Sequence, residues 1–334
     1  MVSWTRLPPA DVEATWDERL LRFADRNLYQ SSQWGRYKRF RGWVPHYFHA
    51  TADGVVVAML QALVRTYPGR TVVAWCPGGP VGALDACTRA GMTELASLLG
   101  ARSFYCRCSF ARVRTAEDDR RLEMNGWTRP DRRLSANLTA VWDLRQTDEQ
   151  LLAGLNRNWR YSLRQAHKSG LVVERLDPPP VSELAELCGA MRRSKGAAAA
   201  ARVPEVAALF GALGDRAIVY GCRDGAGRLV AFHSCAVQGS RAWELIAATS
   251  PEGRDSGASF AVLWALVLHC RQAQVTHYDL AGLDPANAPG VASFKRWTGA
   301  QDVEWLGEWE WTTSALVRHA VGLAVRSRQA SALP

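Results

Sequence analysis

Residues 217–248, with the sequence AIVYGCRDGAGRLVAFHSCAVQGSRAWELIAA, contain three short apolar segments. The segments at 217–222, 229–237 and 242–248 have the length of strands, and the turn sequence Asp-Gly-Ala-Gly at 224–227 separates the first two. Glycine readily supplies the positive φ that tight turns require, so this pattern predicts an antiparallel meander of three strands.

The meander lies within a longer series of predicted elements in the second half of the chain. A strong helix at 148–169 opens this half. Hydrophobic periodicity then predicts, in chain order, a strand at 171–175, helices within 181–213, the meander, an apolar helix at 257–272, a strand at 276–280, a helix at 291–297 and a strand at 302–311.

The first half repeats this order of elements. Its predicted elements are a helix at 12–26, strands at 44–50, 55–64 and 71–75, a helix at 85–99, a strand at 103–110, a helix at 116–125 and a strand at 137–144. A repeated mixed α/β order predicts two copies of one fold, each a mixed sheet flanked by helices. We expect a first domain at 1–147 and a second at 148–312, with the C-terminal segment 313–334 forming a helix that crosses back to the first domain.

Composition restricts the class of protein further. The chain has 41 basic and 32 acidic residues, a net charge of +9, which favours polyanionic partners but also fits a solvated basic surface. Its eight cysteines include no Cys-x-x-Cys pair, so buried, reduced thiols are expected rather than a metal site, with Cys106 and Cys108 on one strand face in the core. No apolar run reaches membrane-spanning length and no leader-like segment opens the chain, which predicts a cytoplasmic protein without membrane insertion.

Three segments carry a resemblance to a known family. They are SSQWGRYK at 31–38, the basic sequence LNRNWRYSLRQAHKSGL at 155–171, and YDLAGL at 278–283 followed by FKRWTG at 294–299. Together these segments resemble the Fem family of tRNA-dependent aminoacyl transferases, which build peptidoglycan interpeptide bridges. Ala281 stands where that family usually has glycine, which leaves the turn possible.

The resemblance implies two domains related to the GNAT acetyltransferases. It places the acceptor near the first domain and the aminoacyl end of the tRNA near the second. Some Fem enzymes carry a long helical arm in the second domain, but the segment 181–215 is too short and too often interrupted by Ala, Gly and Pro to form one. We therefore expect the form without a helical coiled-coil arm.

The resemblance also assigns site residues. In the first domain, Lys38 with Trp34 and Arg36 is expected to bind the acceptor. In the second, Phe294 is expected to be a buried anchor, while Lys295 projects toward the aminoacyl ester and stabilises the oxyanion or holds the terminal tRNA phosphate.

Two further side chains are candidates for proton transfer. Asp279 is expected to orient the loop near Lys295 or to accept a proton from the amine. His233 and Glu244 are expected on adjacent strands, where His233 is either a general base or a core histidine.

The predicted helix after residue 151 carries a basic stripe. Basic side chains recur at steps of three and four, opposite Leu152, Leu155 and Leu163; they are Arg157, Arg160, Arg164 and Lys168. This stripe is either a tRNA-binding surface or a solvated helix face.

A glycine-containing loop at 254–259 bears on the choice of donor. GNAT acetyltransferases bind the CoA pyrophosphate on such a loop, but their spacing requires Gly or Ala where this chain has Ser259. The loop is thus degenerate for CoA, and acyl-CoA stays open as the competing donor.

These features predict an aminoacyl-tRNA-dependent transferase that forms a peptide bond. An aminoacyl-tRNA is already an activated ester, so no nucleophile is required, and the sequence has no Gly-x-Ser-x-Gly, His-Glu-x-x-His or Walker motif. We expect no cofactor, aminoacyl-tRNA as co-substrate, a monomer, and a UDP-muropeptide, lipid II or carrier-bound peptide as acceptor, in peptidoglycan or antibiotic biosynthesis. The alternatives are a GNAT N-acyltransferase that uses acyl-CoA and a non-catalytic basic protein that binds tRNA or peptides.

Overall fold

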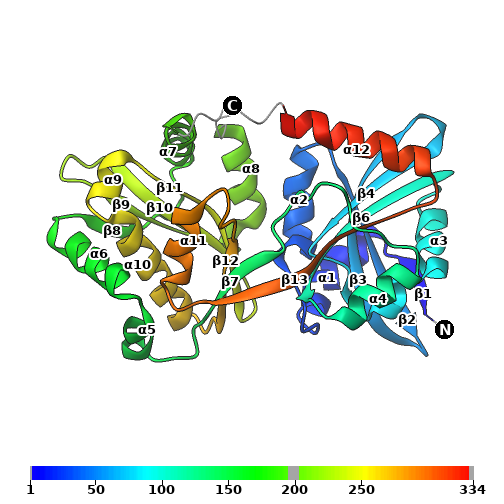
Figure 1. The fold of residues 1–334 in the computed structure, drawn as a ribbon, viewed down its shortest axis with the longest axis horizontal. Coiled ribbons are helices and arrows are strands. Elements are labelled where there is room, and N and C mark those ends of the chain that lie inside the picture. Colours follow the sequence, from blue (N-terminus) through cyan, green and yellow to red (C-terminus); the bar gives the residue numbers. More distant parts are fainter. Residues whose placement is uncertain (1, 195–202, 331–334) are drawn as a thin grey trace. The chain divides into compact units, whose positions relative to one another are not determined.

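The computed structural model describes residues 2–194 and 203–330 and divides the chain into two compact units. Unit 1 contains residues 2–137 and 304–330, and unit 2 contains residues 138–303. Each unit is a mixed sheet flanked by helices, as predicted; unit 1 is drawn mainly in blue and cyan in Figure 1 and unit 2 mainly in green and yellow.

The sheet of unit 1 has the strand order β1-β2-β3-β4-β6-β13. Its pairs are antiparallel except for β4 and β6, which run parallel. The strands are β1 (Ser3–Arg6), β2 (Val44–Ala52), β3 (Val55–Tyr67), β4 (Thr71–Pro77), β6 (Ser103–Val113) and β13 (Gln301–Thr312), with the short β5 (Val81–Gly82) beside β3.

Three helices of unit 1 begin at side chains that accept hydrogen bonds from the first turn. Ser31 accepts from the N–H of Trp34, and Thr88 and Thr115 make the equivalent bonds in their helices. The helices are α1 (Pro9–Leu20), α2 (Ser32–Phe40), α3 (Arg89–Leu98), α4 (Ala116–Met124) and α12 (Ala315–Ala330), with short 3₁₀ turns η1 (Leu28–Gln30), η2 (Pro68–Arg70) and η3 (Leu84–Cys87).

The sheet of unit 2 has the corresponding order β8-β9-β10-β11-β12-β7. Here β11 and β12 form the parallel pair and the other pairs are antiparallel. The strands are β8 (Val172–Arg175), β9 (Ala217–Arg223), β10 (Leu229–Gln238), β11 (Arg241–Thr249), β12 (His277–Gly282) and β7 (Leu138–Asp143), so the predicted meander β9-β10-β11 is confirmed.

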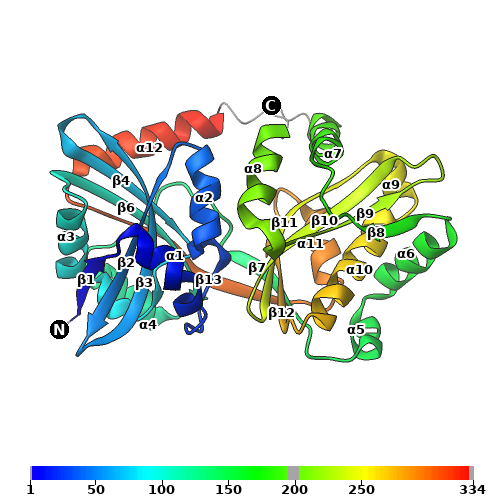
Figure 2. The same cartoon turned by 180° about the vertical axis from the view of Figure 1, so that it is seen from behind.

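Helices flank the unit 2 sheet, and α10 packs on β9 and β10 with α6 beside it (Figures 1 and 2). The helices are α5 (Asp148–Gly154), α6 (Arg157–Lys168), α7 (Val181–Ser194), α8 (Val203–Leu213), α9 (Pro251–Asp255), α10 (Ala258–Gln272) and α11 (Pro289–Arg296), with the 3₁₀ turn η4 (Gly214–Arg216). Within the described ranges no long helical arm occurs; the residues 195–202 of the expected helical stretch 181–213 lie outside them. No helix of the described chain is both long and apolar enough to cross a membrane.

The last strand of each half is exchanged between the units, which the sequence did not indicate. β7, expected to end the first domain, pairs with β12, and β13, expected to end the second, pairs with β6. Packing explains the exchange, since Trp142 of β7 belongs to the unit 2 core and Trp309 of β13 to the unit 1 core. The units therefore divide after residues 137 and 303, in place of the expected boundary after residue 147.

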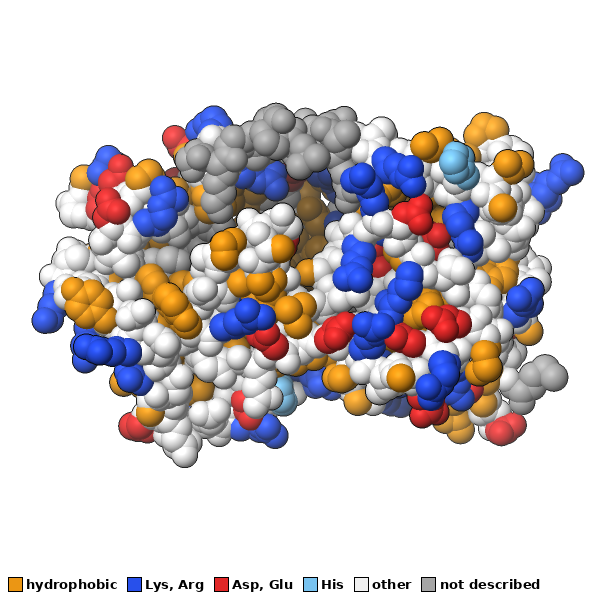
Figure 3. Space-filling view, viewed as in Figure 1, with side chains coloured by type: hydrophobic (Ala, Val, Ile, Leu, Met, Phe, Trp, Pro, Cys, Tyr) orange, Lys and Arg blue, Asp and Glu red, His pale blue; other side chains and the backbone are white. Residues whose placement is uncertain are grey.

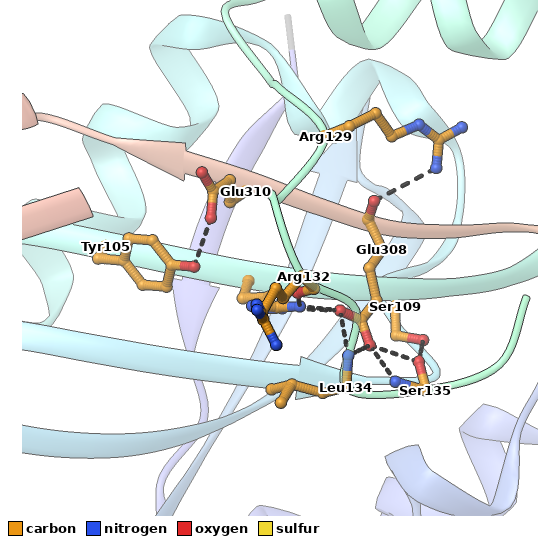
Figure 4. A network of polar contacts seen from close by, with 9 residues as sticks. Tyr105, Ser109, Arg129, Arg132, Leu134, Ser135, Glu308 and Glu310 are labelled. Carbon is orange, nitrogen blue, oxygen red and sulfur yellow. Dashed lines mark hydrogen bonds and ion pairs between the residues drawn. The ribbon is translucent and has the colours of Figure 1, made fainter. Parts of the chain in front are cut away.

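A buried network binds β13 to unit 1 (Figure 4). The Glu308 carboxylate accepts hydrogen bonds from Arg107 Nε of β6 at 2.8 Å and from the N–H groups of Leu134 and Ser135 at 2.9 and 2.6 Å. Glu310, two residues on, accepts from the Tyr105 hydroxyl at 2.6 Å. A buried carboxylate is tolerated only when it is paired in this way, so Glu308 specifies where β13 lies.

The predicted helix at 148–169 is broken into α5 and α6. Leu155 has an extended backbone (ψ 141°), and Asn156 caps α6 by accepting from the N–H of Asn158. Of the three leucines expected opposite the basic stripe, Leu155 and Leu163 are buried, whereas Leu152 on α5 is exposed. Trp159 and Ala166 of α6 also point into the core.

Candidate active site

A cavity of about 540 Å³ opens in unit 2 where the parallel strands β11 and β12 separate. Their paired register ends at Trp243 and Asp279, and the cavity lies beyond that point. Its polar and aromatic lining comes from β10, β11, α10 and α11, and includes His233, Glu244, Ser259, Phe260, Phe294 and Lys295. Diverging strands leave room for a ligand between them, which makes this the candidate active site.

Lys295 of α11 lines this cavity. Its Nζ donates to the backbone oxygens of Gly282 at 2.9 Å and Ala281 at 3.3 Å, at the end of β12. Ala281, which replaces the usual glycine, has a left-handed backbone (φ 62°) that orients the turn. Burial lowers the pKa of the Lys295 ammonium below its ordinary value. Two carbonyls occupy two of its three N–H donors, so the third can point to a substrate oxygen.

Phe294 forms the apolar side of the site. Its ring stacks on His233, with centroids 6.1 Å apart and planes at 18°, and it also contacts Trp159 and Phe260. The ring is half-buried and not fully buried as expected, because it packs on one side and lines the cavity on the other. It thus links the basic helix α6 to the cavity wall.

Asp279 does not line the cavity that Lys295 lines. Its Oδ1 accepts hydrogen bonds from the Thr139 hydroxyl and, at 2.8 Å, from the N–H of Ala281. Burial raises the pKa of this carboxyl. Of its two predicted roles, this geometry favours orienting the turn that carries the carbonyls bound to Lys295.

His233 is the centre of a chain of hydrogen bonds that sequence reasoning recovered only in part. Its Nδ1 lies 2.6 Å from Glu244 Oε1, and its Nε2 lies 2.7 Å from the Oγ of Ser259. The other Glu244 oxygen accepts from the Tyr278 hydroxyl at 2.8 Å. The sequence offers one signal for Ser259, which is its departure from the Gly or Ala that the GNAT loop requires.

The basic stripe of α6 is divided by its contacts. Arg157, Arg164 and Lys168 are exposed. Arg160 is half-buried, and its Nη1 donates to the carbonyls of Ala153 and Leu155 at 2.8 and 2.7 Å. Arg160 therefore caps the C-terminal end of α5, and the other three form the exposed part of the stripe, which stays either a tRNA-binding surface or a solvated face.

The three acceptor-binding candidates of α2 do not share one surface. The Lys38 ammonium lies over the rings of Trp34, Tyr37 and Trp75, 4.5 to 5.2 Å from their centroids. Trp75 also lines a cavity of about 820 Å³ in unit 1. Arg36 instead lines a separate pocket of about 370 Å³, because two residues along a helix correspond to roughly the opposite face.

All eight cysteines are free and buried. Cys106 and Cys108 do share one face of β6, and the structure adds Cys76 of β4, whose Sγ lies 3.8 Å from that of Cys106. The three sulfurs are close enough together to hold a metal ion. The expectation of core packing without a metal stays a prediction.

The two units share one architecture, a mixed sheet with a single parallel pair of strands, β4 with β6 in unit 1 and β11 with β12 in unit 2. Residues 155–296, within unit 2, match the family described as acetyltransferase (GNAT) domain. No curated protein sequence matches the chain.

Solved structures refine that class. FemX, by its crystal structure, is similar with a TM-score of 0.82 at 16% identity, over 96% of this chain and 100% of that one. A tandem GNAT protein from the clavulanic acid biosynthesis pathway has a TM-score of 0.57 at 15% identity over 94% and 98% of the two chains. The C-terminal domain of a putative lysylphosphatidylglycerol synthetase from Agrobacterium fabrum has a TM-score of 0.56 at 16% identity over 96% and 95%. The chain thus has a Fem-like, GNAT-related fold, as predicted.

Proposed function

We propose that this protein is an acyltransferase that moves an aminoacyl group from tRNA to an amine of a peptide acceptor. The observation that carries the proposal is the Lys295 ammonium, held by two carbonyls on the wall of the unit 2 cavity. The Fem-like motifs, whose family uses aminoacyl-tRNA, supply the identity of the donor.

The chemistry needs little beyond alignment, charge and a proton acceptor. Attack of a neutral amine on the ester carbonyl creates an oxyanion, which a partly desolvated cation such as Lys295 stabilises strongly. His233 is oriented by Glu244 and can take up the proton that the amine loses. Removing an electrostatic contact of this kind typically costs about a hundredfold or more in kcat.

Exposed basic residues support a polyanionic donor. Arg157, Arg164 and Lys168 extend along α6, whose buried face contacts Phe294 through Trp159. A tRNA phosphate backbone bound along the exposed face of this helix would place the tRNA on the unit that contains the cavity. We propose no cofactor, with aminoacyl-tRNA as co-substrate.

The acceptor is proposed to bind unit 1. Lys38 and its aromatic neighbours lie beside the cavity lined by Trp43 and Trp75, where an ammonium can bind a phosphate or carboxylate of a UDP-muropeptide, lipid II or carrier-bound peptide. We propose both cell-wall and antibiotic peptides as acceptors, because the Fem-like motifs do not distinguish between them. We further propose that the protein acts as a cytoplasmic monomer.

A transfer assay tests the donor. The protein, a muropeptide acceptor and a radiolabelled amino acid on tRNA are incubated with and without ribonuclease, and acyl-CoA is supplied in a parallel series. We expect label on the acceptor that ribonuclease abolishes. Transfer that resists ribonuclease, or that requires acyl-CoA, would overturn the proposal.

Acyl-CoA is the second candidate donor. The match of residues 155–296 to an acetyltransferase domain favours it, as does the start of α10 after Gly257, where helix amides can bind phosphate. A third reading, a non-catalytic basic protein, predicts tRNA or peptide binding with no transfer in either series.

A further inference from the structure

We propose that Ser259 is a nucleophile and that the acyl group passes through a covalent acyl-serine in the unit 2 cavity. Sequence reasoning expected no nucleophile, because no serine stands in a Gly-x-Ser-x-Gly motif. The inference rests on the proposed function only for the identity of the donor. The activation of Ser259 is argued from its contacts with His233 and Glu244, which do not depend on the donor.

The geometry is that of a nucleophile, a base and an orienting carboxylate. Ser259 Oγ lies 2.7 Å from His233 Nε2, and His233 Nδ1 lies 2.6 Å from Glu244 Oε1. Because a carboxylate can only accept, Nδ1 carries the proton and Nε2 is left as the acceptor for the serine hydroxyl. The Tyr278 hydroxyl donates to the second oxygen of Glu244 at 2.8 Å and holds the carboxylate in place.

His233 and Glu244 are more deeply buried than Ser259, as expected for a serine that is activated by a buried base and must still reach a substrate. His233 and Glu244 are 5% and 9% exposed, so their hydrogen bonds are shielded from water. Ser259 is half-buried, and all three residues line the cavity that holds Lys295. The base and its carboxylate are thus fixed in the interior while the hydroxyl can meet a substrate.

The backbone around Ser259 favours negative charge on its oxygen. Ser259 is the second residue of α10, a helix of 15 residues, and helix N-termini carry a partial positive charge. Gly257 precedes the helix with φ 73°, and a Cβ there would lie 2.9 Å from the carbonyl oxygen of Ser162. Glycine at this position, two residues before Ser259, therefore allows the start of α10 to approach α6 closely.

The two half-reactions balance. In the first, Ser259 Oγ bonds to the ester carbonyl carbon, its proton moves to His233 Nε2, and the leaving ribose oxygen takes that proton as the ester C–O bond breaks. In the second, the acceptor amine bonds to the acyl carbon and gives a proton to His233, which returns it to Ser259 as the acyl-serine bond breaks. The Lys295 ammonium stabilises the oxyanion in both half-reactions, and no oxidant or reductant is needed.

The test uses the full-length protein and a fluorophosphonate, which phosphonylates activated serines. Intact mass and peptide mapping identify the adduct. We expect one adduct on Ser259, no adduct in Ser259→Ala, and labelling at least about a hundredfold slower in His233→Gln, because removing a general base costs that much. The matched control is Ser256→Ala, three residues earlier in the same segment, which should label like the parent protein.

A second measurement follows the acyl group itself. With aminoacyl-tRNA and no acceptor, rapid acid quench should show the aminoacyl mass on Ser259, and Ser259→Cys should carry it as a hydroxylamine-labile thioester. An unlabelled parent protein, an adduct on another residue, or Ser259→Ala with parental transfer and an unchanged melting temperature would overturn the nucleophile. Labelling of Ser259 without transfer from any aminoacyl-tRNA would leave the nucleophile standing and refute the proposed donor.

Discussion

Lys295 is the residue on which the proposed chemistry depends most. Lys295→Ala should fold normally and lose on the order of a hundredfold or more in kcat, because no other group is proposed to offset the oxyanion. Turnover at saturating aminoacyl-tRNA and acceptor measures this. Parental turnover in the Ala variant would show that this lysine is not catalytic.

The same lysine predicts a pH dependence. Since burial lowers its pKa, the catalytic ammonium should be lost as the pH rises through a value below that of an ordinary lysine. The kcat of the parent protein should therefore fall on the alkaline side, and Lys295→Arg, which stays charged, should lack this fall whatever its absolute rate. An identical alkaline limb in both proteins would assign the fall to another group.

Lys38 and Arg36 test which surface of α2 binds the acceptor. Lys38→Ala should raise the acceptor KM with little change in kcat, because the ammonium lies beside the aromatic cavity of unit 1. Arg36→Ala is the matched comparison, since Arg36 lines the separate pocket. A KM that rises only in Arg36→Ala would move the acceptor to that pocket, and weaker tRNA binding in Lys38→Ala would reverse the assignment.

At the scale of elements, α6 combines packing with charge. Its buried Trp159, Leu163 and Ala166 fix the helix in unit 2, while its exposed basic residues face solvent. Much of the basic charge elsewhere is locally compensated: Figure 3 shows basic and acidic side chains interspersed on the face that carries α4, where Arg114 and Arg129 pair with Asp119. The exposed stripe is thus stronger support for a nucleic-acid-binding surface than the net charge of the whole chain.

A triple substitution tests that stripe. Replacing Arg157, Arg164 and Lys168 by Ala should weaken tRNA binding and reduce its dependence on salt. Each phosphate contact that is removed lowers the number of counterions released on binding. Filter binding across a salt series measures both. Arg160→Ala, which removes the cap of α5, should lower stability more than tRNA affinity. An unchanged salt slope in the triple variant would make the stripe a solvated face.

At the scale of the whole molecule, the strand exchange determines which fragments can fold. The fragment 138–303 retains β7, whose Ala140 and Trp142 belong to the unit 2 core. The fragment 148–312 lacks β7 and carries β13, whose partner β6 is in unit 1. We expect the first fragment to be monomeric with a cooperative melt and the second to aggregate, because an unpaired apolar β12 and a free β13 invite association. Size-exclusion chromatography and thermal melts compare them; equal behaviour would mean that the exchanged strands are dispensable.

Local patterns in the sequence were sufficient to predict much of the fold of this protein. Strand-length apolar runs and glycine turns predicted β9 to β11, and the same order of elements in both halves predicted two copies of one fold. The Phe294-Lys295 pair could be selected because its motif is contiguous, and the motif resemblance predicted a Fem-like fold that the structure confirms.

Only the tertiary structure decided the features that depend on contacts between distant residues. The exchange of β7 and β13 follows from the burial of Trp142 in the unit 2 core, the burial of Trp309 in the unit 1 core and the buried Glu308 network. No local periodicity distinguishes a strand that pairs within its own half of the chain from one that pairs with the other half. Likewise, Ser259 meets His233, 26 residues away, only because β10 and the start of α10 lie side by side. Hydrogen bonds of this kind are made by side chains whose proximity is created by packing, and packing is a property of the folded chain.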